Sequence, residues 1–259
     1  MSLGTKVITT KSAADFAKME VAGRCVAAVH DAVRRAAEPG VSMKELDAVA
    51  AEVIGEHGCR PSFLGYHGYP ATICTSPNNV IVHGIPGDYR LREGDILSVD
   101  AGAIYEGWHG DAAFTMAIGE VPEEVQELLV VTEQALWNGL RQARAGNRLG
   151  DIGHAIEATA EPHGYGVVRE YIGHGIGRQM HEAPNVPNYG KAGRGMRLKE
   201  GWALAIEPMF NLGGAETAVL DDGWTVVTAD GSLSAHFEHT VLITPEGPKV
   251  STLPEPVLL

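Results

Sequence analysis

The chain has 259 residues, of which 44% are hydrophobic and 20% charged, and acidic residues outnumber basic ones by 33 to 20, for a net charge of −13. This is a globular composition, and the negative charge argues against a nucleic-acid surface, which needs clustered Lys and Arg. No apolar stretch approaches the ~18 residues of a membrane span, residues 1–10 lack a secretory pattern, and the three cysteines suit neither a disulfide framework nor a CxxC zinc site. We therefore expect a cytoplasmic protein that binds neither nucleic acid nor a membrane.

The first part of the chain predicts two helices and then strands. Ser12 with Asp15 forms a capping box, and the helix it starts stops at the Pro-Gly pair of residues 39–40. Ser42 with Glu45 is a second capping box, for an amphipathic helix that ends at Gly58. Runs of β-type residues follow at 71–75, 80–82, 96–101 and 112–118.

The second part repeats that order. Pro122, followed by two glutamates, starts a long helix that reaches about Gly146, and a fourth helix has its apolar face around Ile152. After Gly164 the pattern predicts strands at 202–207, 218–220, 225–228 and 234–243. The Asp-Asp-Gly sequence at 221–223 predicts a hairpin turn between two of these strands.

The repeated order indicates an internal duplication. The segment LREGDILSVD at 91–100 is echoed by LKEGWALAIE at 198–207, an offset of 107. Four earlier residues recur at an offset of 106: Gly40, Leu46, His57 and Gly58 correspond to Gly146, Ile152, His163 and Gly164. We expect an α+β fold in one domain over residues 1–259, made of two pseudo-symmetric halves at about 12–120 and 121–250, which pair their strands into one sheet with helices outside.

Four carboxylates stand in or beside the predicted strands. Asp100 and Glu207 end the two copies of the repeated segment, Asp111 precedes a strand, and Glu238 lies within one. Each alone has a simple interpretation as a turn residue or ion-pair partner, and cationic partners from elsewhere in the fold remain possible. Because few Arg or Lys lie near them in sequence, divalent cations are the more economical neutralising groups.

Histidines complete the candidate ligand set. His174 lies in Gly-His-Gly-Ile-Gly at 173–177, where glycines let the backbone approach a ligand, although an exposed turn fits equally well. His83 and His181 also stand near glycine, and each alone is more typical of a loop or packing residue. The sequence contains no HExxH, GxxxxGK[ST] or GxSxG motif, which argues against a zincin, a P-loop protein and a serine hydrolase.

Asp100, Asp111, His174, Glu207 and Glu238 resemble, in this order, the five metal ligands of the methionine aminopeptidases. Flanking motifs match as well: GYHGYP at 65–70, HGIP at 83–86, GHGIG at 173–177, IEP at 206–208 and EHT at 238–240. The resemblance runs from about residue 8 to 250. It implies the pita-bread (creatinase/aminopeptidase) fold, with duplicated halves around a mainly antiparallel sheet, and the bacterial type I form, which has neither an N-terminal extension nor an insertion between the last two carboxylates.

The resemblance also implies two divalent metal ions per chain, from among Co, Mn, Fe, Zn and Ni. In the family's arrangement Asp111 and Glu238 bridge both ions, Asp100 holds one, and His174 with Glu207 hold the other. A hydroxide shared by the two ions then attacks the first peptide bond.

Three residues have implied catalytic roles. Glu207 resembles the family's proton shuttle, His83 the residue that contacts the substrate's amine or scissile nitrogen, and His181 the donor to the tetrahedral oxygen. The implied reaction removes the initiator methionine from nascent proteins and peptides, with a small second residue preferred, by a monomer working near the ribosome.

The implied methionine pocket contains six residues, which also match family positions: Phe63, Tyr66, Tyr69, Cys74, Met180 and Trp224. Phe63 and Met180 differ from the residue types usual in the family, which leaves the size of the pocket open. His236, two residues before Glu238, is a further candidate for the surroundings of the second metal ion.

Two alternatives share the scaffold. A prolidase or Xaa-Pro aminopeptidase has the same ligands but normally a large N-terminal domain, whereas only about a dozen residues precede the first predicted helix here. A non-catalytic binding protein loses metal ligands, and this sequence retains all five.

Overall fold

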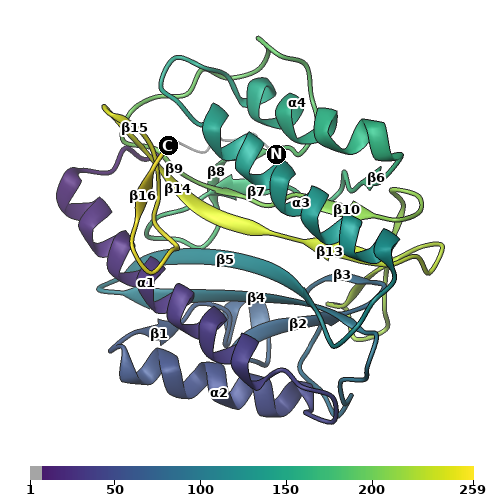
Figure 1. Cartoon of the computed structure of the whole chain (residues 1–259). Helices are drawn as coiled ribbons and strands as arrows, with labels where there is room; N and C mark the ends of the chain where they lie inside the picture. Colours follow the sequence, from purple (N-terminus) through teal and green to yellow (C-terminus); the bar gives the residue numbers. More distant parts are fainter. Residues whose placement is uncertain (1–7) are drawn as a thin grey trace.

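An antiparallel sheet runs through the middle of the molecule and joins the two parts of the chain (Figure 1). The computed structural model describes residues 8–259; the first seven residues, part of the segment over which no secretory signal is expected, lie outside them. Ten strands form this sheet: β1 (Arg60–Pro61), β2 (Ile73–Pro77), β4 (Ile96–Tyr105), β5 (Trp108–Ala117), β7 (Gly173–Gly175), β8 (Glu182–Val186), β9 (Ala203–Ile206), β14 (Glu238–Thr244), β15 (Gly247–Val250) and β16 (Val257–Leu258).

The central strands come from both parts of the chain. Their order is β1-β4-β5-β14-β9-β7-β8, every pair is antiparallel, and β2 pairs with β4. Two three-stranded sheets accompany the expected large one. One is formed by β6 (Gly166–Val167), β10 (Met209–Asn211) and β13 (Ser234–His236), and the other by β3 (Val80–Val82), β11 (Thr217–Val219) and β12 (Val226–Thr228).

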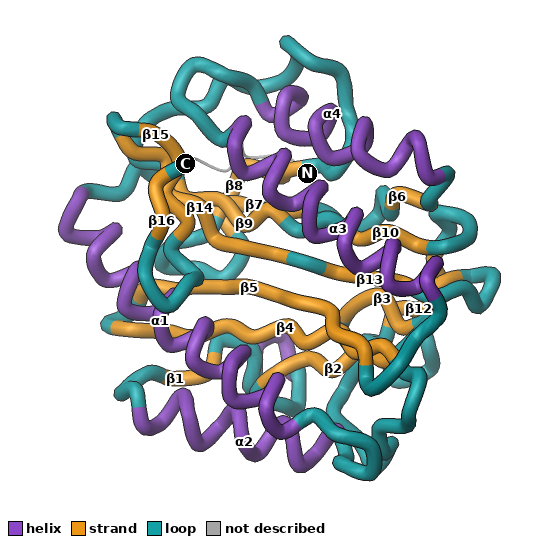
Figure 2. The backbone as a smooth tube through the Cα atoms, in the orientation of Figure 1, coloured by secondary structure: helices purple, strands orange, loops and turns teal. Residues whose placement is uncertain are grey.

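Four helices cover the outside, as predicted: α1 (Ala13–Ala36), α2 (Met43–Glu56), α3 (Glu123–Gln142) and α4 (Leu149–Ala160). Figure 2 shows them beside the strands, with α1 against β4 and β5, and α3 beside β13. Both predicted capping boxes form, each with reciprocal bonds between the serine and the acidic residue three positions later. Two 3₁₀ turns, Tyr66–Gly68 and Glu161–His163, are the remaining helical segments within residues 8–259. No helix within residues 8–259 is both long enough and apolar enough to cross a membrane.

Helices α1 and α3 end three to four residues earlier than predicted, and for the same reason. The Gly40 N–H donates to the Leu91 carbonyl at 2.7 Å, and the Gly146 N–H donates to the Leu198 carbonyl at 3.0 Å. Both glycines have a positive φ, so the chain has already left the helix. These contacts recur at the offset of the sequence repeat, and they support our proposal of one domain with two pseudo-symmetric halves.

The boundaries of several strands differ from the prediction. The runs at 96–101 and 112–118 are parts of one long hairpin, β4 and β5, closed at Glu106 and Gly107, which both have positive φ as a tight hairpin turn requires. Asp111 therefore lies within β5 rather than before it. The predicted strand at 234–243 is interrupted at Phe237, whose N–H donates to the Pro208 carbonyl, so β13 and β14 enter different sheets.

Helix α1 lies against β5 with almost no side chain between them. A Cβ atom added to Gly110 would come within 2.8 Å of the Gly23 backbone nitrogen, and one added to Gly23 would come within 2.1 Å of the Ser251 carbonyl oxygen. A little further along α1, the buried His30 donates from Nε2 to the Ala112 carbonyl at 3.0 Å. The strand that contains Asp111 is thus held from behind by the backbone and one side chain of α1.

His30 should make the protein sensitive to acid. Burial, with a smaller effect of the nearby Arg34 and His239, lowers its pKa to about 3, from the ordinary 6.5. Between these values the unfolded chain binds a proton that the folded protein excludes, so the free energy of unfolding falls as pH falls below 6.5. The His30→Gln variant keeps an amide donor without this titration.

We expect wild type to lose about 1 kcal/mol more stability than this variant between pH 7 and 5.5. Urea unfolding of both proteins at the two pH values, without added metal, measures this difference in the free energy of unfolding. Contributions from other titrating groups are the same in both proteins and cancel. Parallel losses in the two proteins would contradict the assignment.

Candidate metal centre and substrate pocket

Three of the predicted metal ligands meet on one face in the middle of the large sheet. Asp100 on β4 and Glu238 on β14 are both paired with Ala113 on β5, one from each side. Asp111 precedes Ala113 by two residues and therefore projects from the same face. The pairing of strands from the two parts of the chain thus brings these carboxylates together.

The other two ligand candidates come from the second part of the chain. Glu207 directly follows β9, and His174 on β7 is paired with Ala205 of the same strand. His174 Nε2 lies 3.7 Å from Glu207 Oε1 and 3.8 Å from Asp111 Oδ2. The Nδ1 atom of His174 donates to the Gly175 carbonyl at 2.9 Å, which leaves the lone pair of a neutral imidazole on Nε2, facing the carboxylates.

The electrostatics of this group favour neutral side chains as long as no cation is bound. Asp111 and Glu238 are each only 2% exposed. Burial and neighbouring carboxylates raise the pKa of both well above the ordinary range. Burial raises the pKa of Asp100 to about 7, and burial together with the charge of Asp100 raises that of Glu207 to about 8. Burial also lowers the pKa of His174 to about 3.

Several ligand oxygens have no other partner. Asp100 Oδ1, Asp111 Oδ1 and Glu238 Oε1 are buried and accept no hydrogen bond from any described residue. Within residues 8–259, no Lys or Arg forms an ion pair with these carboxylates. One ligand atom each from Asp111, His174 and Glu238 lies within 4.8 Å of the others. Buried, unpartnered carboxylate oxygens beside a neutral imidazole are the donor set that a divalent transition metal takes.

One cavity of about 570 Å³ contains every residue that the sequence assigned to metal, catalysis or substrate. Part of its wall is a cluster of buried apolar side chains, as the predicted methionine pocket requires. Tyr69 is held there by hydrogen bonds from its hydroxyl to the Ile73 and Gly84 carbonyls. The six predicted pocket residues line this cavity: Phe63, Tyr66, Tyr69, Cys74, Met180 and Trp224.

The two predicted catalytic histidines also line the cavity. His181 stacks on Tyr66, accepts or donates a hydrogen bond at Nδ1 with the Tyr66 hydroxyl at 2.9 Å, and has its ring 4.2 Å from that of His174. His83 has a left-handed backbone, with φ +61°, and lies between the rings of Tyr171 and Trp224. Burial lowers the pKa of His83 to about 4, so it is neutral near pH 7.

Sequence analysis did not assign two further residues that line the cavity, His67 and Gln179. His67 lies inside the quoted GYHGYP motif, whereas Gln179 stands in a loop that shows no distinguishing pattern. His236 does not line the cavity, but its buried, unpartnered Nε2 atom lies 3.9 Å from Glu207 Oε2.

Comparisons with known proteins agree with this geometry. Residues 17–245 match the model of metallopeptidase family M24. The methionine aminopeptidase of Clostridium perfringens is 46% identical over 95% of this chain and 99% of its own length, and methionine aminopeptidase 1 of Bacillus subtilis is 47% identical over 93% and 97%. The crystal structure of methionine aminopeptidase from Thermotoga maritima has a TM-score of 0.94 at 43% identity, covering 95% of this chain and all of that one.

A prolidase from Pyrococcus furiosus shares the fold at lower similarity. Its TM-score is 0.77 at 22% identity, and the match covers 95% of this chain but only 66% of the prolidase. The unmatched part of the prolidase agrees with the expectation that prolidases carry a further segment beside the domain they share with this chain.

The Asp111→Asn variant should change stability in opposite directions with and without metal. Folding of the metal-free wild type near pH 7 must protonate the Asp111 carboxyl, which is ionised in the unfolded chain, and Asn removes this cost, so the metal-free variant should be more stable than metal-free wild type. Co²⁺ or Mn²⁺ at about 100 times its Kd should stabilise wild type by ~2.7 kcal/mol and stabilise the variant far less.

Thermal unfolding with and without added metal, together with calorimetric titration, measures both effects. Asp88→Asn is the control, because Asp88 is exposed and paired with Lys44 away from the cavity. Equal metal stabilisation of the Asp111→Asn variant and wild type would contradict the proposed centre.

Proposed function

The chain belongs to metallopeptidase family M24 and, within it, to the methionine aminopeptidases of bacterial type I, and we propose that it removes the initiator methionine from nascent proteins and peptides. One observation carries the proposal: the group of four carboxylates and His174, and the apolar pocket, open into the same cavity. A metal centre can thereby act on the first peptide bond of a chain whose first side chain lies in the pocket.

We propose that the centre holds two divalent ions. Asp111 and Glu238, from the central strands β5 and β14, would hold them together with Asp100, His174 and Glu207. The pairing of Asp100 and Glu238 with the same residue, Ala113, supports this arrangement. When bound, such ions supply Lewis acidity and lower the pKa of a water molecule toward neutrality.

The protein's own groups would then move protons and orient the substrate. Glu207 would accept a proton from the attacking water and pass it to the leaving amine, since its carboxylate faces the cavity. His181, held by Tyr66, would donate a hydrogen bond to the developing tetrahedral oxygen. His83, neutral between its aromatic neighbours, would contact the substrate's amine or scissile nitrogen.

The apolar part of the cavity would select methionine. Phe63, Tyr69, Cys74 and Met180 are buried in one cluster with Trp224 packed against it. Such a wall fits an unbranched thioether and excludes charged side chains by leaving them desolvated. We propose that the second residue is restricted to small side chains such as Gly, Ala or Ser, as the resemblance to the methionine aminopeptidases implies.

The proposed setting is the cytoplasm, near the ribosome, where new N-termini appear, with the protein acting as a monomer. The prolidase alternative is supported only at the level of the fold. The binding-protein alternative is disfavoured because all five ligand candidates and both histidines line the cavity.

An assay on metal-stripped protein reloaded with Co²⁺ or Mn²⁺ tests the proposal, with Met-Ala-Ser, Leu-Ala-Ser and Ala-Pro-Ala as substrates. We expect metal-dependent release of methionine from the first peptide alone. The Glu207→Gln variant should lower kcat by about 10²–10⁴-fold through loss of proton transfer, whereas Asp88→Asn should match wild type. Cleavage of Ala-Pro-Ala instead would favour a prolidase, and metal binding without any turnover would favour the binding protein.

A further inference from the structure

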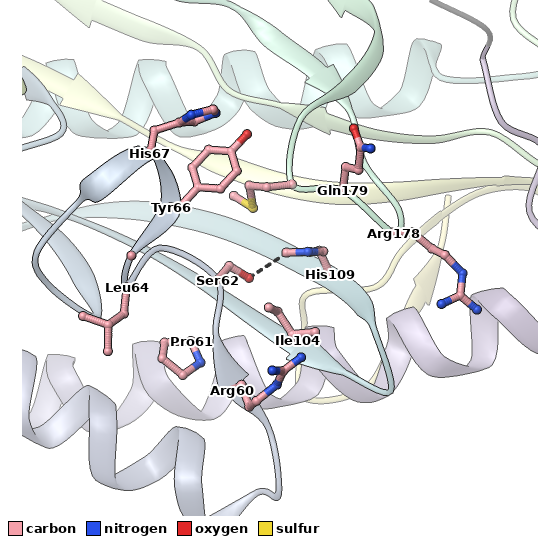
Figure 3. A pocket seen from close by; sticks show the side chains of 12 residues that line it. Arg60, Pro61, Ser62, Leu64, Tyr66, His67, Ile104, His109, Arg178 and Gln179 are labelled. Atoms are coloured by element: carbon pink, nitrogen blue, oxygen red, sulfur yellow. Dashed lines mark hydrogen bonds between the residues drawn. The ribbon is translucent and has the colours of Figure 1, made fainter.

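A second cavity, of about 710 Å³, adjoins the first and is not used by the proposed reaction. The two cavities share four lining residues, Tyr66, His67, Gln179 and Met180. Figure 3 shows Tyr66 and His67 along one edge of this second cavity, with His109 and Ser62 on its floor. A chain that leaves the first cavity across the shared residues therefore enters the second.

Two arginines make part of the lining of this cavity cationic. Arg60 is on β1, and Arg178 lies in the loop after β7 (Figure 3). The Arg178 guanidinium lies 4.8 Å from the centre of the Trp108 ring, a contact that orients it while leaving its N–H groups available. Within residues 8–259 neither arginine forms an ion pair or a side-chain hydrogen bond with protein.

Three carboxylates from neighbouring segments of the chain are already engaged by other groups. Glu182 pairs with Lys11 at 2.8 Å, and Glu106 pairs with Lys18 at 2.8 Å. Asp15, which feels the charge of Arg178 only weakly, bonds to the backbone and hydroxyl of Ser12. In a chain of net charge −13, two unpaired guanidinium groups beside the active-site cavity are available to an anionic ligand.

The rest of the cavity suits a peptide rather than a small ion. Leu64 is 54% exposed at its edge, and Pro61 and Ile104 add apolar surface. On the floor, Ser62 and His109 satisfy each other through a hydrogen bond of 2.9 Å. Apolar surface flanked by cationic groups matches a polypeptide segment with an acidic side chain.

We propose that this second cavity binds the third and following residues of the substrate polypeptide, and that Arg60 and Arg178 select an acidic side chain there. The proposal rests on the proposed function, because it places the first methionine and the small second residue in the first cavity. An extended chain advances about 3.3–3.6 Å per residue, so the segment after the second residue must cross the shared wall or turn away from the protein.

The expected selectivity is modest, because exposed ion pairs contribute little and are screened by salt. For one acidic position we expect about a 2- to 5-fold advantage in kcat/KM over the same peptide with lysine, at low ionic strength. The ratio of kcat/KM for the Asp peptide to that for the Lys peptide should fall toward one in about 0.5 M salt.

The test uses the metal-loaded enzyme and the host peptide Met-Ala-Ser-Gly-Ser-Gly, with Asp or Lys placed singly at positions three to six. Wild type should prefer Asp at one or two of these positions. The double variant Arg60→Glu with Arg178→Glu should reverse the preference to Lys at those same positions, a gain that a folding defect does not produce. Arg141→Glu on α3 is the matched control, because Arg141 is exposed and lies outside both cavities; it should keep the wild-type preference.

The outcomes separate this proposal from the proposed function. Methionine release without discrimination between Asp and Lys would overturn the role of the second cavity and leave the activity intact. A preference for Asp that survives in the double variant would overturn it as well, since the selectivity would then arise elsewhere. If the host peptide itself releases no methionine, the proposed function fails.

Discussion

Four carboxylates crowded into one cavity, three of them on one face of the large sheet, are the constraint on which the architecture depends. Moving a carboxylate out of water is unfavourable, and each additional charge raises the cost for its neighbours. The raised pKa values of Asp100, Asp111, Glu207 and Glu238 express this cost directly. A fold can hold such a group only if a cation neutralises it or if a rigid framework keeps the side chains in place while they are neutral.

The framework here is supplied by both halves of the chain. Where the ladder between β5 and β14 ends, Thr240 continues it through its side chain: its hydroxyl donates to the Asp111 carbonyl at 2.8 Å and accepts from the Asp111 N–H at 3.0 Å. The central strands therefore stay in register at the point where the ligands are. The halves nevertheless differ, because the long β4–β5 hairpin has no counterpart in the second part, where β9 and β14 are separate strands.

The sequence was most informative where local chemistry decides the structure. Capping boxes predicted the starts of α1 and α2, carboxylates in or beside predicted strands indicated four of the ligand candidates, and the family resemblance completed the set with His174. The sequence was least informative where contacts with distant segments determine the local structure. The strand β7 is Gly-His-Gly, which has no strand-forming pattern, and it exists because it pairs with β8 and β9. The interruption at Phe237 and the presence of both Arg60 and Arg178 in the lining of one cavity likewise depend on contacts between distant segments.

The contact between Gly23 and Gly110 extends the active site to the outer side of the sheet. Asp111 follows Gly110 directly, and the backbone of α1 leaves no room for a methyl group there. A side chain added at Gly110 would meet the α1 backbone at Gly23, so either the helix or β5 would have to move, and with β5 the oxygen atoms of Asp111 that are proposed to hold the metal ions. The backbone of α1, which packs directly against β5, thus helps to fix the position of the proposed metal centre on the other side of the strand. Residues of α1 that do not line the cavity therefore influence the proposed catalysis, because they set the position of β5 and of Asp111.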